Sequence, residues 1–213
     1  MTMTREDERK ARASEAPVVG SLPEVPGIVA AMHLSPGLAV HLRGLADALL
    51  VNDFPGATLT RAERELIATA VSASNDCFYC MDSHGAFASE LLRRANATST
   101  SPTVDVEALV DGIKSGGSEG VDAKLAALLQ LARVVQRHGR EVTAADVTRA
   151  VEAGATDGDA QLTVLIASAF CMYNRMVDGL RAKTPASPEA YRARAIEIAE
   201  HGYSDARVQS LPR

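Results

Sequence analysis

Apolar residues recur at the spacing of helices along most of the chain. Between residues 38 and 50, for example, Leu38, Leu42, Leu45 and Leu49 follow one another at intervals of three or four residues, which places them on one face of a helix. The strict alternation of apolar and polar residues that is typical of a half-buried strand is absent from the sequence. The pattern therefore predicts an all-helical fold.

Capping residues and helix breakers set the expected boundaries of these helices. Thr60 with Glu63 has the spacing of a capping box, and Thr143 with Asp146 has a weaker version of it. We expect short helices near 28–33 and 104–114, one helix that starts at Thr60, and others over about 38–50, 77–94, 122–138, 143–153, 158–181 and 188–201. The predicted fold class is all-α, a single-domain helical bundle of about eight helices.

One antiparallel helical hairpin of this bundle carries the most unusual residues. The helix that starts at Thr60 is separated by a very short break from the helix that starts near Cys77, which Asn75 or Asp76 can cap. Helices joined by a few residues generally pack antiparallel. The end of the first helix should therefore lie beside the start of the second.

The chain divides into two predicted parts. Residues 1–25 are dense in charge and then rich in proline and glycine, which predicts a flexible N-terminal tail and lead-in. Residues 26–213 form the predicted helical domain.

Composition narrows the class of protein. The 213 residues include 22 Lys and Arg against 27 Asp and Glu, a formal net charge of −5, which excludes a generally basic nucleic-acid binder. No apolar stretch reaches the roughly 18 residues of a membrane span, and the first residues lack an apolar signal core. Three cysteines do not form the pattern of a secreted disulfide framework. We therefore expect a cytoplasmic protein that binds neither nucleic acid nor membrane.

Two of the cysteines have a spacing that suits redox chemistry. Cys77 and Cys80 are three residues apart, on one face of a helical turn where a disulfide can form and reopen. The first turn of a helix favours a thiolate at Cys77. His84 follows Cys80 by four residues, so its imidazole can exchange a proton with that sulfur. The spacing predicts a dithiol with an adjacent proton carrier.

A carboxylate on the preceding helix can complete this group. Glu65 lies twelve residues before Cys77 and reaches the thiols only if the hairpin brings it there. A carboxylate partly screened from water holds a proton more readily and can relay it between His84 and sulfur. Glu63 points about 200° away from Glu65 on an ideal helix, so we expect only one of the two to face the site.

The combination of Glu65, Cys77-x-x-Cys80 and His84 resembles the active-site pattern of the alkyl hydroperoxidase D family, within the carboxymuconolactone decarboxylase-like superfamily. The resemblance covers the chain from Pro26 to Arg181 and extends to the segments 142–147, 153–157 and 170–178, which are similar to the second half of such proteins. Tyr79 is a departure, since well-studied members have a histidine just before the second cysteine. The sequence looks most similar to the peroxidase-related branch of the family.

The resemblance implies an all-helical homo-oligomer that reduces a small hydroperoxide, organic or hydrogen peroxide, without a cofactor. By position, Cys80 would be the thiol that attacks the peroxide, Cys77 the resolving thiol, and Glu65 and His84 the proton relay. The disulfide formed in each cycle would need an external dithiol reductant, such as a lipoyl or thioredoxin-like protein.

Other interpretations of these residues remain open. The two cysteines could be small buried hydrophobic residues, or a redox-sensing or partner-binding dithiol without efficient turnover. Cys77, Cys80 and His84 could also supply three ligands to zinc, although a structural zinc site needs four. Our preferred interpretation has no metal.

The predicted helix over 158–181 contains two features that we interpret as structural. Cys171 lies in an apolar stretch and is expected to pack in the core. Asn174, Arg175 and Asp178 could form a polar cluster that holds helices or subunits together.

Overall fold

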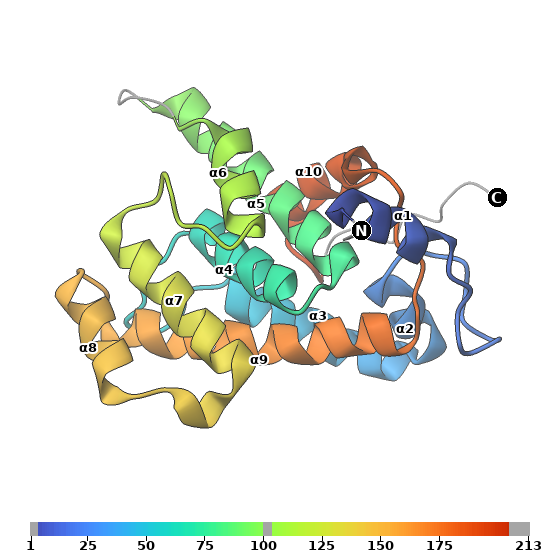
Figure 1. Cartoon of the computed structure of the whole chain (residues 1–213), viewed down its shortest axis with the longest axis horizontal. Coiled ribbons are helices and arrows are strands. Elements are labelled where there is room, and N and C mark those ends of the chain that lie inside the picture. Colours follow the sequence, from blue (N-terminus) through green and yellow to red (C-terminus); the bar gives the residue numbers. More distant parts are fainter. Residues whose placement is uncertain (1–3, 100–103, 205–213) are drawn as a thin grey trace.

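The computed structural model describes residues 4–99 and 104–204 as one bundle of helices (Figure 1). The elements are α1 (Arg5–Ser14), α2 (Ile28–Leu34), α3 (Pro36–Leu50), α4 (Arg61–Ser74), α5 (Phe78–Thr98), α6 (Val106–Lys114), α7 (Ala123–Arg137), η1 (Gly139–Glu141), α8 (Ala144–Glu152), α9 (Asp157–Gly179), η2 (Pro188–Tyr191) and α10 (Arg192–His201). These described residues contain ten α-helices and no strand, which confirms the all-α fold class. None of the described helices combines the length and apolarity needed to cross a membrane.

Helices α4, α7 and α9 form the centre of the bundle. Each of the three contacts the other two, and their inward faces bury Leu66, Ile67, Leu128, Leu162 and Ile166 almost completely. Burying aliphatic side chains of this size contributes about 1.5–3 kcal/mol each. Helix α5 packs along α4, so the hairpin with the two cysteines rests on this central core.

Local sequence signals explain where several helices begin. At α4 the Glu63 carboxylate accepts a hydrogen bond from the Thr60 amide at 2.7 Å, while the Thr60 hydroxyl accepts one from the Glu63 amide. Thr143 and Asp146 make the same reciprocal pair at the start of α8. Both predicted capping boxes are confirmed.

Residues 5–14 form α1, a helix that the sequence analysis did not anticipate within its tail. Thr4 and Asp7 make a capping box at its start. The helix buries none of its own residues and lies beside the start of α5 (Figure 1). It accounts for part of the difference between ten helices and the expected eight or so. The division of the chain at residue 25 stays a prediction.

A glycine at the start of α2 makes room for an aromatic ring of the candidate site. Gly27 is the N-cap of α2 and has a φ of 57°, a left-handed conformation that residues with side chains rarely adopt. A Cβ atom at this position would lie 2.1 Å from the ring of Tyr79. Only glycine lets the backbone of α2 approach Tyr79 this closely.

Gly27→Ala is therefore expected to lower the free energy of unfolding by about 2–3 kcal/mol, since it adds backbone strain to a clash with Tyr79. The matched control is Gly44→Ala in α3, because a Cβ there meets nothing within 4 Å and alanine should stabilise a helix interior by about 1 kcal/mol. Urea unfolding of both variants measures the difference. Unchanged stability of Gly27→Ala would show that the contact with Tyr79 is not tight.

Candidate active site

The two cysteines lie where the chain turns from α4 into α5. Asp76 has a φ of 54°, and Cys77 is the N-cap of α5, with no side chain capping the helix. The expectation that Asn75 or Asp76 caps this helix is therefore wrong, because the turn places Asp76 one residue too early. Cys77 and Cys80 are free thiols, 0% and 2% exposed. They pack with Leu22, Ala30, Val177 and Ala182 in an apolar cluster.

The surroundings of Cys77 favour its protonated form. A hydrogen bond with Cys80 and burial, together with the charges of Cys80 and Asp178, raise the pKa of the Cys77 thiol well above its ordinary value. The expectation that the helix start favours a thiolate at Cys77 is therefore wrong. Cys77 keeps its proton and can share it with the Cys80 sulfur.

Asp178, near the end of α9, is a neighbour of Cys77 that the sequence analysis assigned to a structural cluster. Burial raises the pKa of the Asp178 carboxyl, and a hydrogen bond with the Cys77 thiol partly offsets this rise. The residue lies 101 positions from Cys77 in the sequence. No local spacing could have predicted the contact.

Glu65 and His84 meet at the centre of the hairpin. Nδ1 of His84 lies 2.7 Å from Oε2 of Glu65, and Glu65 is 1% exposed. Edge-on contact with Phe170, at 4.5 Å between ring centroids, further fixes the imidazole. The structure therefore brings together the carboxylate and the imidazole that the sequence analysis paired. Nδ1 is held by Glu65, so Nε2 is the ring nitrogen left for exchange with a ligand or water.

Tyr203 joins this pair and was missed by the sequence analysis. Its hydroxyl donates a hydrogen bond of 2.6 Å to Oε1 of Glu65. Burial, followed by the charge of Glu65, raises the pKa of Tyr203 far above its ordinary value, so the hydroxyl keeps its proton. Tyr203 follows α10 and lies 138 residues from Glu65. Only the tertiary packing of α10 on α5 brings it there.

Glu63 and Glu65 have separate roles, as the helix geometry predicts. Glu63 closes the capping box of α4 and lies 3.6 Å from Nζ of Lys124. Glu65 faces inward to His84. The expectation that only one of these carboxylates faces the site is confirmed.

His84 borders a cavity of about 190 Å³. Within the described chain, His84 makes no direct hydrogen bond to either cysteine, so proton exchange with sulfur would pass through water or a ligand. The cavity walls come from the lead-in, α2, α3, α5 and the C-terminal part of the chain. Tyr79 lines the cavity and also packs against the cysteine cluster. Tyr79 therefore lies at the boundary between the cavity and the thiols.

Tyr79, which stands where the family resemblance led us to expect a histidine, is a neutral aromatic wall. Burial raises the pKa of its hydroxyl above the ordinary value, and its ring meets that of Tyr191 edge-on at 5.6 Å between centroids. The Tyr191 hydroxyl is buried and has no hydrogen-bond partner in the described structure. Tyr79 thus shapes the site and cannot carry a proton at neutral pH as histidine does.

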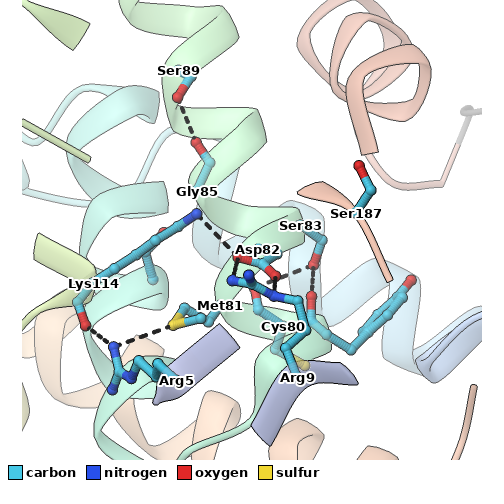
Figure 2. Close-up of polar contacts among 12 residues, drawn as sticks. Arg5, Arg9, Cys80, Met81, Asp82, Ser83, Gly85, Ser89, Lys114 and Ser187 are labelled. Atoms are coloured by element: carbon cyan, nitrogen blue, oxygen red, sulfur yellow. Dashed lines mark hydrogen bonds and ion pairs between the residues drawn. The ribbon is translucent and has the colours of Figure 1, made fainter. Parts of the chain in front are cut away.

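A buried ion-pair network surrounds Asp82, in the turn of α5 that carries Cys80 (Figure 2). The Asp82 carboxylate, 0% exposed, accepts hydrogen bonds from Nε of Arg9 at 2.9 Å and from Nζ of Lys114 at 3.0 Å. The Arg9 guanidinium also lies over the ring of Phe78. Arg5 donates a hydrogen bond to the Lys114 carbonyl. These contacts fix α1 and α6 to the start of α5 and so hold the turn that carries Cys80.

The other polar groups of α9 are structural. Asn174 accepts a hydrogen bond from Asn75 at 2.8 Å and donates one to Ser72 at 3.1 Å, which ties α9 to the end of α4. Among the residues that the structure describes, Arg175 donates only to the carbonyl of Cys171, on its own helix. Cys171 is half-buried against the main core. Cys171 thus packs against the edge of the core and is not fully buried in it, and Asn174 holds helices together.

The donor groups do not assemble into a metal site. Across residues 4–99 and 104–204, no three His, Cys, Asp or Glu side chains converge in a way that could hold a metal ion. Cys77, Cys80 and His84 therefore do not make the zinc ligand set that the sequence allowed.

A comparison with known protein families gives a match over part of the chain. Residues 40–95, which contain Glu65, both cysteines and His84, match the carboxymuconolactone decarboxylase family. A comparison with curated proteins gives no match.

Two solved structures resemble the chain over most of its length. One is described as an alkylhydroperoxidase AhpD core, a peroxidase-related protein from Ralstonia eutropha JMP134, with 27% identity, a TM-score of 0.62, and coverage of 78% of this chain and 80% of that chain. A peroxidase-related protein from Silicibacter sp. TM1040 shares the fold, with 22% identity, a TM-score of 0.64, and coverage of 84% of this chain and 93% of that chain. The family match over residues 40–95 and the likeness to these two structures support the assignment of the chain to the carboxymuconolactone decarboxylase-like superfamily, in its alkyl hydroperoxidase D-like group.

Proposed function

We propose that this protein is a thiol-dependent peroxidase that reduces organic hydroperoxides or hydrogen peroxide through a Cys77/Cys80 dithiol-disulfide cycle. The observation that carries the proposal is the 2.7 Å contact between Glu65 and His84, one helical turn beyond Cys80. A buried carboxylate that fixes one nitrogen of an imidazole leaves the other nitrogen positioned for proton transfer. The peroxidase-related names of the two similar structures support the same activity.

The first half of the cycle oxidises Cys80. Its thiolate attacks one peroxide oxygen, the O–O bond breaks, and the leaving oxygen departs as alcohol or water after it receives a proton. His84 supplies this proton through Nε2, and Glu65 stabilises the imidazole in both protonation states. Sulfur is oxidised to a sulfenic acid, and the peroxide is reduced.

The second half of the cycle forms the disulfide. The Cys77 sulfur attacks the Cys80 sulfenic acid, the S–O bond breaks, and the hydroxide leaves as water with the proton of the Cys77 thiol. Asp178, which is hydrogen-bonded to that thiol, is placed to assist its deprotonation. An external dithiol then reduces the disulfide and returns both cysteines to thiols.

The reductant in this proposal is a lipoyl or thioredoxin-like dithiol, and the protein acts as a cytoplasmic homo-oligomer. Both thiols are almost fully buried, so the reductant needs the cover of the cysteine cluster to move. Part of this cover is Leu22 and Val25 from the lead-in. The same burial favours the second candidate function, a redox-sensing dithiol that is oxidised once and is not turned over efficiently.

Peroxide consumption by the reduced protein tests the proposal and separates the two candidates. Stopped-flow mixing with cumene hydroperoxide should consume one equivalent of peroxide per chain and remove two thiols. Added dihydrolipoamide should then sustain many turnovers. A single equivalent without turnover, with either dihydrolipoamide or reduced thioredoxin, would support the sensor, and no consumption at all would contradict both.

Glu65→Gln is expected to slow peroxide consumption by about 10²-fold, because general acid-base groups typically contribute 10²–10⁴-fold. The amide keeps the size of the side chain but cannot stabilise a protonated imidazole. The matched control is Glu63→Gln, which removes the same charge from the same helix and should leave the rate within about twofold. Equal rates for wild type and Glu65→Gln, measured by stopped flow on the reduced proteins, would remove the proton relay from the mechanism.

A further inference from the structure

The cavity beside His84 has apolar walls and an uncompensated positive charge. Its walls include Val25, Ile28, Met32, Phe87 and Ile198, and no aspartate or glutamate is among its described lining residues. Two arginines line it, Arg43 from α3 and Arg194 from α10. The two arginines differ in their partners.

Arg194 is engaged within the protein, whereas Arg43 is not. A guanidinium nitrogen of Arg194 lies 3.1 Å from the Glu197 carboxylate. Arg43 makes no ion pair or hydrogen bond through its side chain in the described part of the chain. Its neighbour one turn along α3, Asp47, accepts hydrogen bonds from the amides of Tyr203 at 2.6 Å and Ser204 at 2.8 Å instead. The Arg43 guanidinium is therefore available to a ligand.

The Glu65 carboxylate, next to His84, does not line the cavity. Glu65 is buried behind His84, and its two oxygens contact His84 and the Tyr203 hydroxyl. Arg43 and His84 thus border one cavity from different helices. A ligand that places an anionic group on Arg43 can place its apolar body between α2 and α5, with its far end next to His84.

The size of the cavity limits the apolar body. A volume of about 190 Å³ is slightly larger than a 150 Å³ protein cavity that binds benzene. A substituted phenyl ring or a chain of comparable size fits, and guanidinium pairs most strongly with a planar carboxylate through two parallel hydrogen bonds.

We propose that this cavity binds small carboxylates with an apolar body, and that Arg43 receives the carboxylate. Resting on the proposed peroxidase function, the inference names the substrate class as hydroperoxides that carry a carboxylate at the end opposite the peroxide. Arg43 is then a specificity-determining residue, and His84 acts at the other end of the substrate.

Binding of unreactive ligands tests the site without relying on activity. The probes are 4-isopropylbenzoate and its neutral counterpart, 4-isopropylbenzyl alcohol, measured by isothermal titration calorimetry. The wild type should bind the benzoate at least tenfold more tightly than the alcohol. Arg43→Gln should weaken benzoate binding by about tenfold, which is about 1.4 kcal/mol, and leave alcohol binding within twofold.

Two further variants serve as controls. Arg43→Lys keeps the charge without the planar fork and should fall between wild type and Arg43→Gln. Arg140→Gln removes an exposed arginine outside the cavity and should leave both affinities unchanged. Equal affinity of the wild type for the two ligands, or benzoate binding insensitive to Arg43→Gln, would overturn the proposal.

A pair of hydroperoxides separates this inference from the proposed function. Cumene hydroperoxide and its para-carboxy derivative differ only in the carboxylate. Preferential reduction of the carboxylated compound in the wild type, lost in Arg43→Gln, supports both proposals. Equal reduction of the two compounds overturns the carboxylate site and leaves the peroxidase standing. Benzoate binding through Arg43 without reduction of either compound overturns the peroxidase and leaves the carboxylate site standing.

Discussion

Cys80→Ser is expected to slow peroxide consumption by at least about 10³-fold, because a serine hydroxyl at neutral pH is a far weaker nucleophile than a thiolate. The substitution changes one atom in a side chain that is 2% exposed, so the fold should persist. The matched control is Cys171→Ser, which removes the third thiol from a half-buried position on α9 and should leave the rate unchanged. Stopped-flow loss of peroxide, with circular dichroism to confirm folding, gives the comparison.

Cys77→Ser completes this experiment, because it separates the attacking thiol from the resolving thiol. The Cys77 thiol keeps its proton through its hydrogen bond with Cys80 and its burial, so we expect Cys80 to react first. Cys77→Ser should consume one equivalent of peroxide and stop at the sulfenic acid, which dimedone traps on Cys80. Dimedone labelling of Cys77 in Cys80→Ser, with peroxide consumed at the wild-type rate, would reverse the two roles.

Local sequence signals predicted the parts of the site that lie within one hairpin. Cys77 at the start of α5 is followed along the helix by Cys80 and His84, and the short break after α4 predicted that the helix with Glu65 packs beside them. The contact between Glu65 and His84 therefore follows from helical periodicity and one tight turn. The capping boxes at Thr60 and Thr143 were predictable for the same reason, because each involves residues only three positions apart.

Residues that reach the site from distant segments were not predictable. Tyr203, Asp178 and Arg43 lie on or beside α10, α9 and α3, and each depends on how those helices pack around α5. The state of Cys77 was also mispredicted, because a helix start favours a thiolate only where burial does not outweigh it. The helix α1 was missed since it buries no residue and is fixed by its ion pair with Asp82, which no apolar pattern reveals.

Asp159 connects the start of α9 to a loop about 100 residues earlier in the chain. It closes the capping box of α9 with Thr156, and one carboxylate oxygen also accepts hydrogen bonds from the amides of Thr58 at 2.6 Å and Leu59 at 3.0 Å. The carboxylate is fully buried. It therefore joins the start of α9 to the loop that leads into α4, the helix that carries Glu65.

Asp159→Ala is expected to lower the free energy of unfolding at pH 7 by about 4 kcal/mol, because it leaves several buried amide donors without an acceptor. The matched control is Asp146→Ala, which removes a partly buried capping-box carboxylate from the start of α8, where it bonds only to Thr143 and Arg149 within the described residues, and should cost about 1 kcal/mol. Urea unfolding of both variants measures these values. Equal losses for the two variants would show that the contacts with Thr58 and Leu59 add nothing.

The pH dependence of this loss gives a second test of the same carboxylate. Burial acts to raise the pKa of Asp159, but hydrogen bonds from Thr156, Thr58 and Leu59 outweigh it, so the pKa in the folded protein lies below its ordinary value. A carboxyl with a lowered folded pKa contributes its stabilisation above the unfolded pKa of about 3.9 and loses it as the pH falls through the folded pKa. The difference in unfolding free energy between wild type and Asp159→Ala should therefore be constant near neutral pH and shrink below about pH 4. A difference that grows as the solution is acidified would contradict this account, since it would require the carboxyl to stabilise the fold in its protonated form.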